Sequence, residues 1–312
     1  DVTVSSGDVV DLADANTISF AGAPAVNASG SFTTSAATVN FNGNVSGAGV
    51  NVTASTQLSV AAGVTVQTDT NDIDFSAADI VIAGTASISA AAGTPSVIFR
   101  GDGAADTIGV GTGAAGAVSL SEAELQTVAA SIAQIEIGTA GTQTGTITVD
   151  DVGDNGILVL SNTSLLLHAD GPAAVNQIAT GAIDLSGGAG HGLRGNGADG
   201  GTTLRANVST QGGAVFIDDT VTLGADITID TAVGAAAGAN VDFDSTTGSG
   251  TVDGAQTLTI DPGTGGNATF DGAVGSGTPL DALVVERGGT VTLPAVTTTT
   301  DGVNGVNLGS TA

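Results

Sequence analysis

The residues in this chain best suited to chemistry are its aspartates. The sequence holds 31 acidic residues against 4 basic ones, and its formal net charge is −27. Paired or alternating carboxylates supply the oxygen ligands that Ca²⁺ prefers. The competing interpretation is that these groups are solvated turn residues, because Asp readily hydrogen-bonds its own backbone. No cofactor is required by the pattern, but the sequence predicts candidate calcium ligands at Asp102, Asp106, Asp150, Asp151, Asp218, Asp219, Asp242 and Asp244.

The stretch that begins at Arg100 contains two short motifs. Gly101-Asp102-Gly103, followed by Asp106 and Ile108, shares part of a calcium-binding nonapeptide pattern, although Asp and Ala stand where two glycines should. Arg100-Gly101-Asp102 is also the tripeptide that animal integrins bind. In a chain this rich in Gly and Asp such a tripeptide arises easily by chance.

Residues for catalysis are scarce. The chain has no Cys, which excludes disulfides, thiolate metal sites and cysteine nucleophiles. Its two histidines, His168 and His191, have no partner at the spacing of a metal site. Sugar-cleaving clefts usually combine acids with aromatic platforms and basic side chains, and this sequence has no Trp, Tyr or Lys. We therefore predict that the chain is not an enzyme.

The charge balance also limits the partners. The basic residues are all arginines, namely Arg100, Arg194, Arg205 and Arg287. Phosphate backbones and anionic membrane surfaces are bound by clustered Lys and Arg, so neither is an expected partner. No apolar run is long enough to span a bilayer. The chain starts at Asp1 with no visible signal peptide, which suggests a mature or excised segment of a secreted product.

Short apolar units must position all of these residues. The stretch from Thr220 to Leu293 repeats an apolar–polar–apolar triplet, and Gly, Asp, Asn and Pro stand between the triplets. Alternation with period 2 indicates short half-buried strands, and the intervening residues favour turns. Similar triplets run from Val2 to Phe99. The pattern predicts an all-β fold, a single-stranded parallel β-solenoid, in which the Phe residues that end several triplets fill the core.

The expected organisation is one elongated solenoid over residues 1–312. Turn-rich stretches at 100–117 and 186–201 predict protruding loops or a seam. Ser121 and Glu124 form a capping box before Leu125, Val128 and Ile132, which predicts a helix near 121–134. Residues 297–312 are expected to be a frayed tail or a linker. Neither end has a capping helix, which predicts end-to-end self-association.

Three segments carry a resemblance. "VIFRGDGAADTIGVG…AVSLSEAELQTVAASIAQIEIGTAGTQTGTITV" at 97–149, "AVFIDDTVTLGADITIDT" and "GTVDGAQTLTIDPGTGGNATFDGAVGSGTPLDALVVERGGTVTL" resemble giant bacterial β-strand-repeat proteins of the filamentous-haemagglutinin type. Residues 1–96 match only in style. The resemblance implies a right-handed parallel β-helix that is secreted, exposed at the bacterial cell surface and used in adhesion. The secretion domain that such proteins carry is absent from this sequence.

Two functions therefore stay open. The first is a non-catalytic structural or adhesive rod of an extracellular bacterial surface or filament protein, stacked end to end on itself or continuous with a longer parent chain. The second is a glycan-binding or glycan-cleaving β-helix, like a tailspike or a polysaccharide lyase, with cell-surface glycans as partners. Acids that converge beside an aromatic or basic residue on one face would favour the second.

Overall fold

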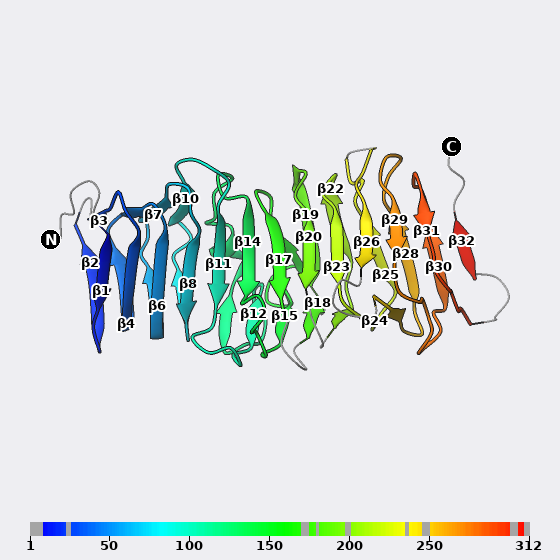
Figure 1. The fold of residues 1–312 in the computed structure, drawn as a ribbon, viewed down its shortest axis with the longest axis horizontal. Helices are drawn as coiled ribbons and strands as arrows, with labels where there is room; N and C mark the ends of the chain where they lie inside the picture. Colours follow the sequence, from blue (N-terminus) through cyan, green and yellow to red (C-terminus); the bar gives the residue numbers. More distant parts are fainter. Residues whose placement is uncertain are drawn as a thin grey trace.

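The chain winds into a parallel β-solenoid. The computed structural model describes residues 9–22, 26–169, 175–178, 181–196, 201–234, 237–244, 250–299 and 305–308. Strands follow one another in chain order along the long axis of the molecule (Figure 1). Each strand pairs in parallel with its equivalent in the next coil, as Val97 does with Ile135 and Val215 with Val241. This confirms the fold class predicted from the triplets.

Sheet A is the longest face, and it runs from one end of the solenoid to the other. Two of its strands, β4 and β6, are long enough to pair with two strands along one edge, so β2 and β9 lie beside the main path. Its fourteen strands are β1 Val10–Ala13, β2 Thr17–Ala21, β4 Phe32–Asn42, β6 Val50–Val60, β8 Ile73–Ala77, β9 Ile80–Ile82, β11 Ser96–Arg100, β14 Gln134–Gly138, β17 Ser164–His168, β20 Leu193–Asn196, β23 Val215–Asp218, β26 Val241–Asp244, β29 Ala268–Phe270 and β31 Val291–Thr292.

Three shorter sheets form the other faces. Sheet B contains β3 Val26–Asn27, β5 Val45–Gly47, β7 Thr65–Thr68 and β10 Ser87–Ala90. Sheet C contains β12 Ile108–Val110, β13 Val118–Leu120, β15 Ile147–Val149, β18 Asn176–Ile178, β21 Thr202–Leu204, β24 Val221–Leu223 and β27 Val252–Asp253. Sheet D contains β16 Ile157–Val159, β19 Ala182–Ala189, β22 Val208–Gln211, β25 Ile227–Asp230, β28 Thr257–Asp261, β30 Ala282–Val285 and β32 Val306–Leu308.

The core is a narrow column of aliphatic side chains and phenylalanines. Alternate residues of each strand point inward, and the inward ones are almost all Val, Ile, Leu, Ala or Phe. Phe75 packs on Phe99, and Phe243 stacks on Phe270 with ring centroids 4.9 Å apart. All four rings are fully buried. The prediction that such rings fill the core is confirmed.

Amide side chains tie the corners of successive coils together. Oδ1 of Asn240 accepts a hydrogen bond from the backbone N–H of Asn267 at 3.0 Å. Oδ1 of Asn267 in turn accepts one from the backbone N–H of Thr290 at 2.9 Å. Backbone N–H groups at a turn lack a ladder partner and need another acceptor. The stacked amides therefore satisfy the turns and fix the register between coils.

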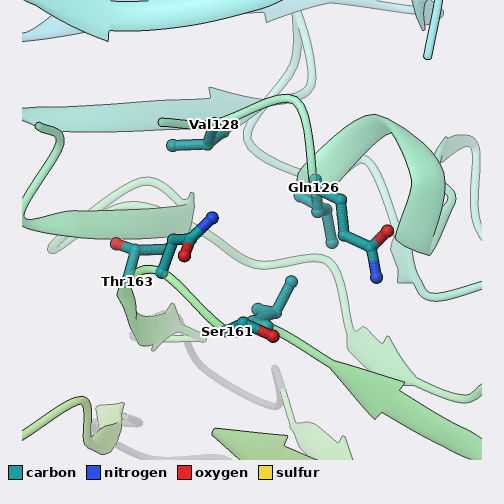
Figure 2. A pocket seen from close by; sticks show the side chains of 7 residues that line it. Gln126, Val128, Ser161 and Thr163 are labelled. Atoms are coloured by element: carbon teal, nitrogen blue, oxygen red, sulfur yellow. The ribbon is translucent and has the colours of Figure 1, made fainter. Parts of the chain in front are cut away.

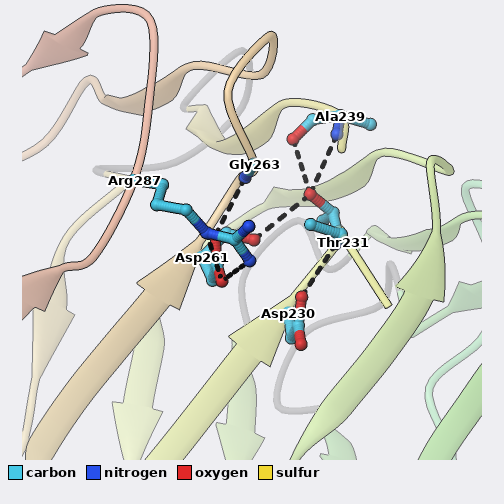
Figure 3. Close-up of polar contacts among 7 residues, drawn as sticks. Asp230, Thr231, Ala239, Asp261, Gly263 and Arg287 are labelled. Carbon is cyan, nitrogen blue, oxygen red and sulfur yellow. Dashed lines mark hydrogen bonds and ion pairs between the residues drawn. The ribbon is translucent and has the colours of Figure 1, made fainter. Parts of the chain in front are cut away.

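A second kind of corner uses an arginine and a threonine, shown in Figure 3. Arg287 Nε donates to both carboxylate oxygens of Asp261, at 2.9 and 3.0 Å, and the backbone N–H of Gly263 donates to Asp261 Oδ1. The buried Thr231 hydroxyl donates to the Ala239 carbonyl at 2.8 Å and accepts from the Ala239 N–H at 3.0 Å. The Thr231 hydroxyl thus binds both the N–H and the carbonyl of Ala239, and it closes the loop between β25 and β26.

An extra strand interrupts sheet C where the loop over 100–117 was expected. The sheet runs in the order β13, β12, β15, so the later strand β13 lies on the N-terminal side of β12. After β12 the chain turns back toward β13, and this return segment, residues 114–116, passes directly over the outer side of β12. A Cβ added to Gly109 would meet the Ala114 carbonyl oxygen at 2.6 Å. The predicted loop is therefore interrupted by β12, and the crossing depends on a residue without a side chain.

The helix predicted over 121–134 is much shorter than expected. Only α1, Glu122–Leu125, is helical, although the capping box is present: Ser121 N donates to Glu124 Oε2 at 2.8 Å. The chain then leaves the helix because β10 needs backbone partners. The Ile88 N–H donates to the Thr127 carbonyl, and the Ala129 N–H donates to the Ile88 carbonyl. The helical spacing of Leu125, Val128 and Ile132 correctly predicted that these residues are buried, but it overestimated the length of the helix.

A pocket of about 280 Å³ opens beside α1, where sheet B gives way to sheet D. Figure 2 shows that Gln126, Val128, Ser161 and Thr163 face it. Its lining contains no titratable side chain, and Gln126 Nε2 is already bound to Glu122 Oε1 at 2.7 Å. The pocket is a packing seam between two sheets.

Two further boundary predictions need correction. Much of the stretch expected to be a loop at 186–201 is strand, because β19 continues to Ala189 and β20 spans Leu193–Asn196. The tail expected at 297–312 contains β32, which pairs with β30. The strand expected at Val2–Val4 lies outside the described residues. Within the described ranges, no helix has the length and hydropathy needed to cross a membrane.

Candidate functional site

The acids near the Arg-Gly-Asp tripeptide serve a local turn. Asp106 Oδ2 accepts a hydrogen bond from the Gly103 N–H at 2.9 Å, and the Asp106 N–H donates to the Gly103 carbonyl at 3.1 Å. Partial burial and the neighbouring Asp106 raise the pKa of Asp102 above its usual value. The two carboxylates are therefore close to each other, but one of them already closes the turn.

The Arg-Gly-Asp tripeptide does not present a free arginine. Arg100 is the last residue of β11, and its guanidinium forms an ion pair with Asp74 of the preceding coil. Nε donates to Asp74 Oδ1 at 2.8 Å, and Nη2 donates to Oδ2 at 2.7 Å. Such a bidentate pair fixes the side chain against the sheet. This arrangement favours the chance interpretation of the tripeptide.

The two aspartate pairs lie at different corners. Asp151, the second residue after β15, is fully buried, and its Oδ1 accepts a hydrogen bond from the Thr112 N–H at 2.7 Å. It thereby anchors the segment that crosses β12. Asp219, after β23, is also buried, and its Oδ2 accepts from the Thr202 hydroxyl at 2.8 Å. Asp150 and Asp218 stand beside them in the chain, so the structure does not unite the pairs in one site.

The remaining acids form a ladder on sheet A. Asp218 of β23 stands opposite Asp244 of β26, and Asp242 lies on the same strand as Asp244. Sequence reasoning missed Asp271, which follows β29 and shares a hydrogen bond with Asp244 that raises the pKa of Asp271. Partial burial, and then the charges of Asp244 and Asp271, raise the pKa of Asp242. Among the described residues no three acidic, His or Cys side chains form a group that could hold a metal ion. Calcium binding stays a prediction.

Neutralising Asp271 is expected to stabilise the fold at pH 7. Its raised pKa means that the folded state binds the proton more tightly than the unfolded chain does. Ionised Asp271 therefore opposes folding, and stability is recovered as the pH falls through the folded-state pKa. Asp271→Asn should raise the melting temperature at pH 7, by the equivalent of at most about 0.5 kcal/mol because the side chain is solvent-screened.

The matched control is Asp154→Asn, which removes the same charge from an exposed turn. Added NaCl or Ca²⁺ should raise the melting temperature of the unmodified chain and narrow the difference between it and Asp271→Asn. An equal stabilisation by both variants would show that net charge matters and the ladder does not.

The histidines occupy different settings. Nε2 of His168, at the end of β17, lies 3.6 Å from Glu136 Oε2 on the neighbouring strand β14. The hydrogen bond from His168 lowers the pKa of Glu136, against the opposing effect of partial burial. His191 lies in the turn between β19 and β20 and is half-buried.

A row of outward-facing side chains on sheet A gathers unlike groups that the sequence separates widely. We call it the outer row. Residues that face each other on successive strands include an acid, an aliphatic residue, a cation and an aromatic ring. In order the row is Asp74, Ile98, Glu136, Leu166, Arg194, Phe216 and Asp242.

The contact between Arg194 and Phe216 is the most distinctive in this row. The Arg194 Cζ lies 4.8 Å from the centroid of the Phe216 ring. Arg100 and Arg287 are neutralised by Asp74 and Asp261, whereas Arg194 has no carboxylate partner among the described residues. Arg194 is exposed and Phe216 is half-buried. Neither residue was predicted as a site residue, although one signal was available: Phe216 is the middle, outward member of the triplet Val215-Phe216-Ile217.

A hollow of about 260 Å³, which we call the Gly192 trough, runs beside this contact. Ser164, Gly192 and Ala214 occupy equivalent positions in successive coils: Ser164 is the first residue of β17, and the other two directly precede β20 and β23. None of the three has a large side chain, and Gln134 of β14, on the preceding coil, also lines the hollow. Arg194 and Phe216 line it as well. The arrangement can bind a small polar ligand, and it offers no nucleophile paired with a base.

Comparison with known protein-family models, curated proteins and solved structures gave no match for this chain.

Proposed function

We propose that this chain is a non-catalytic structural and adhesive rod at an extracellular bacterial surface. The observation that carries the proposal is the continuous stack of parallel strands along sheet A, tied at its corners by Asn–Asn and Arg–Asp contacts. Each coil packs on its neighbours over a continuous apolar core, and we expect such a stack to be rigid. A rigid rod holds a binding surface away from a cell, which is what an adhesin requires.

The rod is also suited to stacking on another copy of itself or on more of the same kind of chain. Among the residues described, β32 pairs with β30 and has no further strand on its outer side. Val306 and Leu308 of β32 are 46% and 48% exposed. Unpaired strand edges invite strand addition, and a head-to-tail contact propagates rather than closes. Repulsion from the net charge of −27 opposes this association, so cations should promote it.

A second candidate is a glycan-cleaving role on the same fold. Arg194 and Phe216 beside the Gly192 trough favour glycan contact. The geometry does not favour cleavage as strongly, because glycoside hydrolysis ordinarily needs two carboxyl groups facing one bond. The trough lining includes no carboxylate.

Binding and turnover can be separated in one experiment. Beads coated with the purified chain are washed over a panel of immobilised acidic and neutral polysaccharides, and the supernatant is assayed for reducing ends and unsaturated products. We expect retention of the beads on at least one surface without product release. Product release would reverse the non-catalytic assignment, and failure to adhere to any surface would contradict the adhesive role.

A further inference from the structure

We propose that the Gly192 trough binds an acidic saccharide, with Arg194 holding the carboxylate of a uronic acid unit and Phe216 packing against the sugar ring. This inference rests on the adhesive function and names its ligand class. It also assigns separate roles to two residues, one for charge and one for ring contact, which makes each role testable by itself.

The first step concerns Arg194. Its guanidinium is exposed, has no carboxylate partner among the described residues and is held over the ring of Phe216 at 4.8 Å. Stacking on the ring face leaves the N–H groups at the guanidinium edge free to point away from the ring. A guanidinium held in this way can donate two parallel hydrogen bonds to one carboxylate. The Arg194 side chain then loses little conformational entropy when the ligand binds.

The second step concerns the acids in the same row. Glu136 and Asp242 each stand two strands from Arg194 along the outer row, which is about 10 Å at the usual strand spacing. At that separation they are largely screened at physiological salt. Glu136 is in addition engaged by His168 and by Gln134 Nε2 at 3.2 Å. Arg194 is therefore a local cation on a strongly acidic protein, and its best complement is a ligand carboxylate.

The third step concerns shape. Gly192 and Ala214 line the trough without large side chains, and the half-buried Phe216 lines it with an aromatic ring. Its volume of about 260 Å³ lies just below that of pockets that bind drug-sized ligands, so the trough suits a single sugar unit. Ser164 Oγ accepts a hydrogen bond from the Gly192 N–H at 3.1 Å and keeps its own hydrogen for a ligand oxygen. A ring contact together with hydroxyl partners is the chemistry that recognises a saccharide.

A peptide fits this surface less well. Peptides that bind sheets usually add a strand to an open edge, where backbone groups are unpaired. The trough lies on the face of sheet A between β17, β20 and β23, whose backbones already pair with one another. Side-chain groups alone are available to a ligand there, and this favours a saccharide with its many hydroxyls and one carboxylate.

The test uses the whole chain and an α-1,4-linked trigalacturonate as the probe, titrated by calorimetry in EDTA so that bridging cations are absent. We expect binding to the unmodified chain and weaker binding of maltotriose, which lacks carboxylates. Arg194→Ala should weaken trigalacturonate binding by at least about tenfold, the usual scale for a charged hydrogen bond. Phe216→Ala should weaken both saccharides.

Arg205→Ala is the matched control, because it removes the same charge from another exposed position. Circular dichroism checks that each variant keeps its fold. No detectable trigalacturonate binding, equal losses in Arg194→Ala and Arg205→Ala, or maltotriose binding as tight as trigalacturonate binding would each overturn the proposal. If the unmodified chain does not bind trigalacturonate, and the beads adhere equally well with the unmodified chain and with Arg194→Ala, this site is rejected and the adhesive rod still stands.

Discussion

Replacing Phe243 with alanine is expected to lower the free energy of unfolding by about 3–5 kcal/mol, the usual cost of removing a buried aromatic ring. Phe243 is fully buried in β26, stacks on Phe270 and stands opposite Ile217 on β23. The solenoid core is one residue layer deep per coil, so neighbouring coils cannot easily close the cavity. Urea denaturation followed by circular dichroism measures the loss.

Phe216→Ala supplies the control for this prediction. Phe216 belongs to the adjacent strand β23, but it faces outward and is half-buried. Its removal should cost well under half as much as that of Phe243, because less apolar area returns to water. Equal losses for the two variants would mean that the inward and outward assignments of sheet A are wrong.

Substituting alanine for Gly109 is the second change with a large expected effect. The new Cβ would lie 2.6 Å from the Ala114 carbonyl oxygen and 2.8 Å from the Ala114 carbonyl carbon, where the chain crosses β12. Backbone on both sides has little room to move, and overpacking of this kind typically costs about 1–3 kcal/mol. We expect a lower melting temperature together with looser packing of β12, which hydrogen exchange at Ile108–Val110 would detect.

Gly84→Ala is the comparison for this change. A Cβ at Gly84 meets no atom within 4 Å, and its backbone does not adopt a positive φ. Alanine there should be neutral or slightly stabilising, since it reduces the freedom of the unfolded chain. If Gly109→Ala were equally harmless, the return segment 114–116 would not lie against β12.

The strands could be predicted from the sequence because each one carries its own evidence. Triplets such as Val215-Phe216-Ile217 and Val241-Asp242-Phe243 alternate inside and outside residues, and the structure places them in β23 and β26. Turn residues between them predicted the corners. Local patterns of this kind depend only on a few neighbouring residues.

Elements that depend on other coils were harder to predict. The helix near 121–134 ended early because Ile88, far back in the chain, takes backbone hydrogen bonds from 127–129. The strands within 186–196 were not predicted because glycines there favoured a loop. In the structure these glycines pack against the backbone of neighbouring coils. In both places tertiary contacts overrode local preference.

The candidate site was the least predictable part. Arg194 and Phe216 are brought together only by the register of β20 with β23. Corner lengths vary from coil to coil, so this register cannot be counted from the sequence. The aspartates, in contrast, were conspicuous as residue types, yet Asp106 and Asp151 each accept a backbone hydrogen bond within the fold.

Electron microscopy of the purified chain, with and without millimolar Ca²⁺, tests the rod and its end-to-end stacking most directly. We predict unbranched rods of constant width that lengthen when Ca²⁺ screens the net charge of −27 and that shorten again in EDTA. Light scattering should report the same change in mass. Compact particles would contradict the rod, and rods that stay strictly monomeric at high concentration in both conditions would contradict its end-to-end stacking.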